Sequence, residues 1–474
     1  MMFWWGRAAV PARRRSRRAF VVAAPAALSQ YAFNGAGAPT TNKWGLAIFA
    51  LTYLVFTLSP VHQLADSQYS MLLSQSLLQH RTFTLDHYPL PRLEPKQQIG
   101  WISNGYLYQL ELINGHIYYY FPPGSSILSV PYVAVMNALG IAAVNPDGSY
   151  NRQGEIAIQA GLAALLMAAL ATIFFYTARL VLPLGWSLLL SLGAAFGTQM
   201  WSTASRSLWS DTWAIFLLGC VVWMLVAHEC GQYHIRPVLL ASLLAWTYFV
   251  RPTNILAIAA ITIYVFVYRR PLFARYAVTG SAWLLGFFAY SWYHFGQLLP
   301  HYFQGNLTFR CFWTALAGNL ISPSRGLFVY VPVLGFIAYW LIRYARESAS
   351  PRLVIMSVGI ILVHLIVIAG FFPWWGGHCY GPRYTTGLLP WFVLLGIQAI
   401  RARLTWEIKQ GSLSRSRDWR SELIVGAALL GCSMVINARG AIDHRTTMWN
   451  FRPMNINDHP ERVWDWSDPQ FLAR

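Results

Sequence analysis

Seven ionisable side chains stand beside long apolar runs, where charged residues are otherwise scarce in this chain. They are two carboxylates, four guanidinium groups and one imidazole: Asp66, Asp211, Arg206, Arg251, Arg325, Arg383 and His378. A charge at bilayer depth is costly unless it is paired or hydrated. A single arginine there would be read as a snorkelling anchor. Seven such groups at one level instead predict a polar cavity at the ends of membrane helices.

Asp66 is the residue best placed for chemistry, because it directly follows the first long apolar run. A carboxylate held at the membrane surface can act as a general base. Alternatively, Asp66 caps the helix expected over residues 67–79, whose apolar arc suits a position in the membrane interface. The two roles are compatible.

The composition identifies the class of protein that carries these residues. The chain has 474 residues, of which 56% are hydrophobic and only 11% are charged. A soluble domain usually has about a quarter charged residues. The chain therefore cannot cover a water-exposed surface, and we expect an all-α polytopic membrane protein.

Apolar runs long enough to cross a bilayer predict about eleven transmembrane helices, each with ends uncertain by a few residues. The expected ranges are 44–64, 155–178, 184–203, 208–228, 236–251, 254–268, 277–295, 326–342, 353–373, 384–400 and 421–438. The two short helices around Arg251-Pro252-Thr253-Asn254 have an alternative reading as one long kinked helix.

The distribution of charge favours eleven spans and sets the sidedness. This count places 21 of the 35 Lys and Arg residues, but only 5 of the 17 Asp and Glu residues, on the side of the N-terminus. Fusing the pair at Arg251 would put three basic loops outside. The positive-inside rule then predicts a cytoplasmic N-terminus and an extracytoplasmic C-terminus. The net charge of +18 is thus a topology signal and a contact for anionic lipids, not a nucleic-acid patch.

These spans divide the chain into three parts. Residues 1–42 form a basic tail, although residues 16–20 also resemble a twin-arginine export signal. Residues 43–438 form the bundle, and a long first outer loop covers residues 64–154. Residues 439–474 form a short outer cap.

The segment Tyr118–Ser126 is the landmark of the first outer loop. Its two prolines prevent a helix from starting before Gly124, and an apolar stretch follows over residues 127–143. A full span here would break the charge pattern, so we expect a re-entrant or interfacial helix. A twelfth span is the alternative.

Other familiar site motifs are absent. The sequence has no nucleotide-binding glycine motif on a strand–helix unit, no C-x-x-C pair and no H-E-x-x-H helix, so we predict no metal or cofactor site, although a divalent metal is not excluded. Cys311 and Cys379 both fall outside, where they form a disulfide or remain as two free thiols.

The order of these motifs resembles the GT-C integral-membrane glycosyltransferases, especially the branch of protein O-mannosyltransferases and aminoarabinose transferases. The similarity covers about residues 43–390. It rests on Asp66 after the first span, on Tyr-Phe-Pro-Pro in the first loop and on four later segments: Ser205–Asp211, Arg251–Asn254, Ser322–Leu327 and Gly381–Tyr384. Phe121 stands where family members usually have His, and the C-terminal part lacks a large outer domain.

The resemblance implies sugar transfer from a polyprenyl-phosphate donor on the outer face, in a bacterial inner membrane, usually with inversion. Asp66 would deprotonate the acceptor hydroxyl. Arg251, Arg325 and Arg383, with Arg206 and His378, would stabilise the departing lipid phosphate. Asp211 would hold an arginine, orient the acceptor or bind a metal. The acceptor (protein, lipid or glycan) and the sugar are left open.

Two other functions compete with this interpretation. A transporter or lipid flippase also gathers charges at the membrane edge, but it needs polar groups near the middle of the membrane, where the sequence has few. A non-catalytic scaffold is the third alternative. Loss of sugar transfer in Asp66→Asn would separate them.

Overall fold

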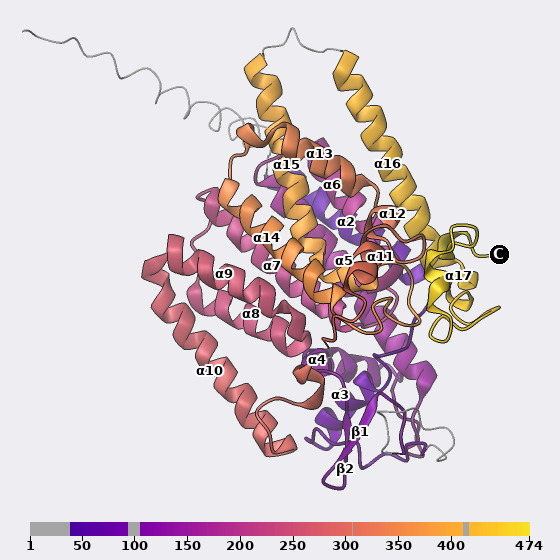
Figure 1. Cartoon of the computed structure of the whole chain (residues 1–474). Helices are drawn as coiled ribbons and strands as arrows, with labels where there is room; N and C mark the ends of the chain where they lie inside the picture. The colour runs from indigo at the N-terminus through magenta and orange to yellow at the C-terminus, as the bar shows by residue number, and fades with distance from the viewer. Residues whose placement is uncertain (1–37, 93–104, 306, 411–416) are drawn as a thin grey trace, which may run out of the picture.

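A computed structural model describes residues 38–92, 105–305, 307–410 and 417–474. These residues are mostly helical, with one short antiparallel hairpin among them formed by β1 (Leu110–Ile113) and β2 (His116–Tyr119) (Figure 1). The prediction of an all-α class is thus confirmed, because the described residues form a helical bundle with almost no strands. The basic cluster and the export-like segment of the N-terminal tail lie outside the described residues.

The helices fall into two groups by length. The longer ones are α2 (Ala38–Leu58), α5 (Arg152–Arg179), α7 (Ser210–Glu229), α10 (Arg270–Phe295), α14 (Pro351–Ala369), α15 (Leu389–Gln410) and α16 (Arg417–Ile442). The shorter ones are α3 (Ser70–Gln79), α4 (Gly124–Ala138), α6 (Leu184–Phe196), α8 (Pro237–Val250), α9 (Ile255–Tyr268), α11 (Phe312–Ile321), α12 (Leu327–Tyr330), α13 (Val333–Arg343) and α17 (His444–Met448).

Six segments of the described chain are long and apolar enough to cross a membrane. They are Arg152–Arg179, Ser210–Glu229, Arg270–Phe295, Pro351–Ala369, Arg383–Gln410 and Trp419–Ile442. Five further apolar helices are shorter. Each of the eleven predicted ranges overlaps a helix. The protein is therefore a membrane protein by its helices, but a count of eleven spans is not confirmed.

Proline explains why several predicted spans are short helices. Arg251 precedes Pro252, and this position disfavours helical backbone. Arg251 is accordingly extended (φ −149°, ψ 109°), so α8 ends at Val250 and α9 starts after a 3₁₀ turn, Pro252–Asn254. The predicted break between two short helices is confirmed. Pro332 likewise separates α12 from α13.

The bundle is built around α5, which packs against α2, α6 and α7. Most of α15 is also buried among other helices. By contrast, α10 and α16 lie at the edges of the bundle, and only 11% of the apolar window of each is buried (Figure 1). An apolar helix that the protein leaves uncovered is suited to contact lipid.

The first loop packs as a unit of α3, the hairpin and α4 below the bundle (Figure 1). α4 begins at Gly124, after the two prolines, as predicted. Its 15 residues are too few for a span of about 20 residues. A Cβ atom at Gly124 would lie 2.5 Å from the backbone of Phe249 on α8, so glycine permits this contact.

α3 differs from the interfacial helix that we expected. Residues Ser70–Ser76 are buried on all sides, because α3 is enclosed by α4 and α5. Tyr69, in a left-handed conformation (φ 72°), occupies its N-cap position. Asp66 lies three residues earlier, so its carboxylate does not cap this helix.

The C-terminal residues form a compact cap beside α11. Trp449, Ile456 and Val463 pack there against Trp374 and Trp375. The cap contains α17 and two 3₁₀ turns, Pro460–Trp464 and Gln470–Leu472. α16 extends to Ile442, slightly beyond the predicted start of the cap at residue 439.

Candidate active site

The Asp66 carboxylate lies at the centre of a polar cluster at one end of the bundle. Its Oδ2 atom accepts a hydrogen bond from Arg383, and its Oδ1 atom accepts one from the hydroxyl of Tyr108 at 3.2 Å. The Tyr119 hydroxyl donates to the backbone carbonyl of Asp66 at 2.7 Å. The Asp66 side chain is 26% exposed, so it remains accessible to water.

Arg383 connects Asp66 to a second segment of the chain. It begins the 3₁₀ turn Arg383–Leu388 at the start of α15. Its guanidinium carbon lies 3.7 Å from the centre of the Trp209 ring. Such a cation–π contact holds the guanidinium plane in place without using its N–H donors. Trp209 is the residue before α7, and Asp211 is in the first turn of that helix.

A second ion pair lies in this cluster, between Asp211 and Arg251. Arg251 Nη1 donates to Asp211 Oδ2 at 2.5 Å and to Ser210 Oγ at 3.1 Å. Thr253 Oγ1 accepts from Arg251 Nε at 3.1 Å. Asp211 is completely buried, and its other oxygen, Oδ1, has no hydrogen-bond partner in the described chain. A buried carboxylate oxygen without a donor is costly, and such an atom is a natural contact for a ligand hydroxyl.

Tyr302 lies near both ion pairs. The charges of Arg251, Asp66, Arg383 and Asp211 all act on its hydroxyl. Burial is the largest influence and raises the pKa of Tyr302. The pKa values of Tyr108 and Tyr119 are also raised, first by burial and then by the charge of Asp66. The three hydroxyl groups therefore remain protonated and are able to donate hydrogen bonds, as those of Tyr108 and Tyr119 do to Asp66.

Aromatic rings line one side of the cluster. The Phe121 ring centre lies 5.7 Å from that of Tyr119, 5.2 Å from that of Tyr302 and 6.2 Å from that of Tyr108. Beneath them is a cavity of about 10 Å³, enough for roughly one water molecule. Its lining includes Asp66, Ser67, Tyr119, Phe121 and Ser210.

Two side chains on α5 connect the segment that carries Asp66 to the segment that carries Asp211. Gln159 donates to the carbonyl of Ser67 at 2.8 Å and accepts from Ser207 Oγ at 2.8 Å. Glu155 is fully buried and accepts from the backbone N–H groups of Tyr69 (3.1 Å) and Met71 (2.9 Å). Gln159 also donates to Glu155 at 3.0 Å. This network joins the residues after Asp66 to those before Asp211.

Four of the seven predicted site residues thus come together: Asp66, Asp211, Arg251 and Arg383. Arg206 instead donates to the carbonyls of Phe56 and Ser59 at the end of α2. Arg325, between α11 and α12, and His378, between α14 and α15, instead contact the C-terminal cap. His378 is 2.9 Å from Asn455 Oδ1, and its ring centre lies 4.2 Å from that of Phe451.

Arg325 makes five hydrogen bonds to neutral oxygens. Its acceptors are the carbonyls of Ser324, Trp375 and Gly377 and the side chains of Asn450 and Gln470. This arrangement uses the guanidinium group as a cross-link between the cap and two loops of the bundle. It leaves little of the group for a substrate.

The sequence reasoning missed several residues of the cluster. Tyr119 belongs to the landmark segment and Trp209 to the segment before Asp211, so their neighbours could have suggested them. Tyr302, Glu155 and Gln159 carry no local signal, because only the tertiary packing brings them to Asp66. Among the described residues no three His, Cys, Asp or Glu side chains are grouped to hold a metal ion. All five cysteines are free.

In comparisons with known proteins, no protein-family model and no curated protein matches the chain. The class that the fold and cluster define is a helical membrane protein with two buried or half-buried Asp–Arg pairs at one end of its bundle.

Proposed function

We propose that the protein is a membrane glycosyltransferase that moves a sugar from a polyprenyl-phosphate donor to an acceptor hydroxyl, on the extracytoplasmic face of a plasma membrane. The observation that carries this proposal is the convergence of the Asp66–Arg383 and Asp211–Arg251 pairs. It brings a water-accessible carboxylate and two guanidinium groups to one end of a membrane bundle. A lipid-linked substrate presents its phosphate at that level.

The chemical roles follow from the ordinary properties of these groups. Asp66 accepts the proton of the acceptor hydroxyl as its oxygen attacks the anomeric carbon. The bond between that carbon and the phosphate oxygen breaks, and its electron pair goes to the phosphate. Arg383 and Arg251 stabilise the charge that develops on the phosphate. The proton then passes from Asp66 to water, which is supported by the exposure of this side chain.

The Asp66–Arg383 pair suggests how substrate binding activates the base. A paired carboxylate is a weaker base than one released from its cation. A donor phosphate competes with Asp66 for Arg383, because arginine binds phosphate bidentately. Once the phosphate holds Arg383, the Asp66 carboxylate is free to accept a proton. The stacking on Trp209 keeps Arg383 in place during this exchange.

The aromatic rings of Tyr119, Phe121 and Tyr302 fit a sugar substrate. Aromatic rings pack on the apolar face of a sugar ring, and the hydroxyl groups of the two tyrosines can add hydrogen bonds at the edge of the sugar. The 10 Å³ cavity has no room for a sugar, so these rings must move apart when the substrate binds.

The test compares purified wild-type protein with Asp66→Asn in membranes that contain a panel of radiolabelled polyprenyl-phosphate sugars. We expect transfer to fall by about 100- to 10,000-fold, the range of a general base. Asp147→Asn is the matched control, because Asp147 is an exposed loop acid that bonds only with Ser149. It should retain wild-type activity.

Two outcomes would overturn the proposal. Full activity of Asp66→Asn would remove Asp66 as the base. No label transfer by the wild-type protein with any donor would favour the transporter or flippase interpretation, which fluorescent-lipid translocation in the same vesicles would then measure.

A further inference from the structure

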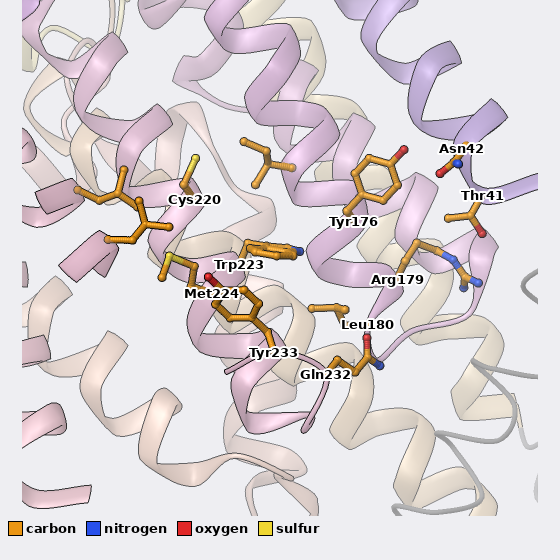
Figure 2. A pocket seen from close by; sticks show the side chains of 13 residues that line it. Thr41, Asn42, Tyr176, Arg179, Leu180, Cys220, Trp223, Met224, Gln232 and Tyr233 are labelled. Atoms are coloured by element: carbon orange, nitrogen blue, oxygen red, sulfur yellow. The ribbon is translucent and has the colours of Figure 1, made fainter. Parts of the chain in front are cut away.

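A large cavity lies at the opposite end of the bundle from Asp66. Its volume is about 770 Å³, which is in the range of small-molecule sites. It lies between α2, the last turns of α5, α7 and the start of α8 (Figure 2). α2 and α5 each have one end next to the Asp66 segment, and Asn42 and Arg179 are at their other ends. The separation along α2 is roughly 25 Å.

The lining of this cavity is amphipathic. Arg179, Asn42 and Thr41 gather on one side, and Cys220 and Met224 lie on the other (Figure 2). Tyr176, Trp223 and Tyr233 lie between the two sides (Figure 2), and Leu239 and Leu243 extend the apolar part. Leu239 is 42% exposed, so the apolar part opens to the outside of the bundle. A ligand with a polar head and an apolar tail matches this division.

Arg179 is the only charged residue among the described residues that line the cavity. Its Nη1 atom donates to the carbonyl of Leu182 at 2.7 Å, whereas its buried Nε atom has no acceptor in the described chain. No carboxylate among the described residues pairs with Arg179. Two other arginines at this end do have a carboxylate partner: Arg269 pairs with Glu229 at 3.0 Å and Arg403 with Glu422 at 3.0 Å. Arg179 therefore has N–H donors left that can bind an anionic group from outside the chain.

We infer that this cavity binds one anionic phospholipid of the surrounding membrane, with its phosphate on Arg179 and an acyl chain along the apolar wall. Arginine suits a phosphate better than a point charge does, because its fork of N–H donors matches the phosphate oxygens. Basic pockets between membrane helices commonly hold anionic headgroups. The inference is independent of the proposed sugar transfer, because the two sites lie at opposite ends of the bundle.

Native mass spectrometry of the full chain, released from vesicles of equal phosphatidylglycerol and phosphatidylcholine, tests this site. We expect the wild-type protein to retain one phosphatidylglycerol in preference to phosphatidylcholine. Arg179→Ala should reduce that preference roughly fivefold or more, the effect of removing one arginine near a charged headgroup. Arg346→Ala is the control, because Arg346 is an exposed arginine at the same end, outside the cavity.

A second variant tests the apolar part. Leu239→Trp fills the open side of the cavity and should lower retention of both lipids. It also keeps the test decisive if Arg179→Ala fails to fold. Equal retention of the two lipids by the wild type, an unchanged preference in Arg179→Ala, or a lipid-free dimer with a second copy covering the cavity would each overturn the inference.

Discussion

The Asp66 cluster and the loop that carries Arg325 beside the C-terminal cap both bury arginine, but they satisfy it in different ways. Beside the cap, Arg325 donates to five neutral oxygens, and no carboxylate of the described residues pairs with it. In the cluster, Arg383 and Arg251 each bind a carboxylate, and Asp211 Oδ1 is left without a donor.

This contrast distinguishes a structural cation from one that can bind a ligand. A guanidinium group enclosed by backbone carbonyls cannot leave them without exposing buried polar groups, which costs free energy for each one. The Asp66–Arg383 pair lies beside water and can exchange one anion for another. The cluster therefore has the properties of a site, whereas Arg325 has those of a cross-link.

The largest effect that separates the two regions should come from Arg383→Lys. Lysine keeps the charge but loses the bidentate geometry and the stacking on Trp209. We expect sugar transfer to fall by about 100- to 1,000-fold, the loss typical for one donor to a developing anion. The thermal midpoint should change little. Radiolabel transfer and thermal denaturation of the same preparation measure both.

The opposite pattern should follow from Arg325→Met. This change leaves the oxygens of Gln470, Asn450 and three carbonyls without their donor, so stability should fall by about 3 kcal/mol. Transfer per folded molecule should remain at the wild-type value. A loss of activity without a loss of thermal stability would show that Arg325 belongs to the site and is not a structural cross-link.

Gln159→Met should give an intermediate effect, because Gln159 positions the segments that carry Asp66 and Asp211 and does not itself bind substrate. The change removes its bonds to Ser67, Ser207 and Glu155. Misplacement of Asp66 by a fraction of an ångström should lower kcat by about tenfold. KM for the donor should be nearly unchanged. The separate effects on kcat and KM, measured per folded molecule, distinguish this positioning role from a simple loss of stability. Gln159→Glu keeps the acceptor for Ser207 but places a second buried carboxylate beside Glu155, so it should not recover kcat.

The sequence was sufficient for local features and insufficient for the packing between them. Pro252, just after α8, sets the end of that helix, and Pro123 sets the start of α4, because the effect of proline is confined to neighbouring residues. Asp66, Asp211, Arg251 and Arg383 could be placed at one level by the order of apolar runs. Sequence order could not separate Arg325 from them, since four of its five acceptors come from three distant segments.

Contacts from distant segments also explain why α3 is not the interfacial helix that we expected. Its apolar arc suggested a helix on the membrane surface, but α4 and α5 cover its other faces as well. Ser70, Ser74 and Ser76 are buried there and are paired with polar partners such as the carbonyls of Ser126 and Thr84. A helix with serines on its second face looks surface-bound until those partners are known.

Tyr302→Phe should have the smallest effect and would sharpen the boundary of the cluster. The change removes one hydroxyl and keeps the ring that contacts Phe121 and Tyr120. If the hydroxyl donates to the substrate near the four charges that surround it, transfer should fall by about three- to tenfold, the value of one neutral hydrogen bond. Tyr339→Phe is the control, because Tyr339 lies at the other end of the bundle, near Glu422. Equal activity of Tyr302→Phe and Tyr339→Phe would confine the site to the two ion pairs.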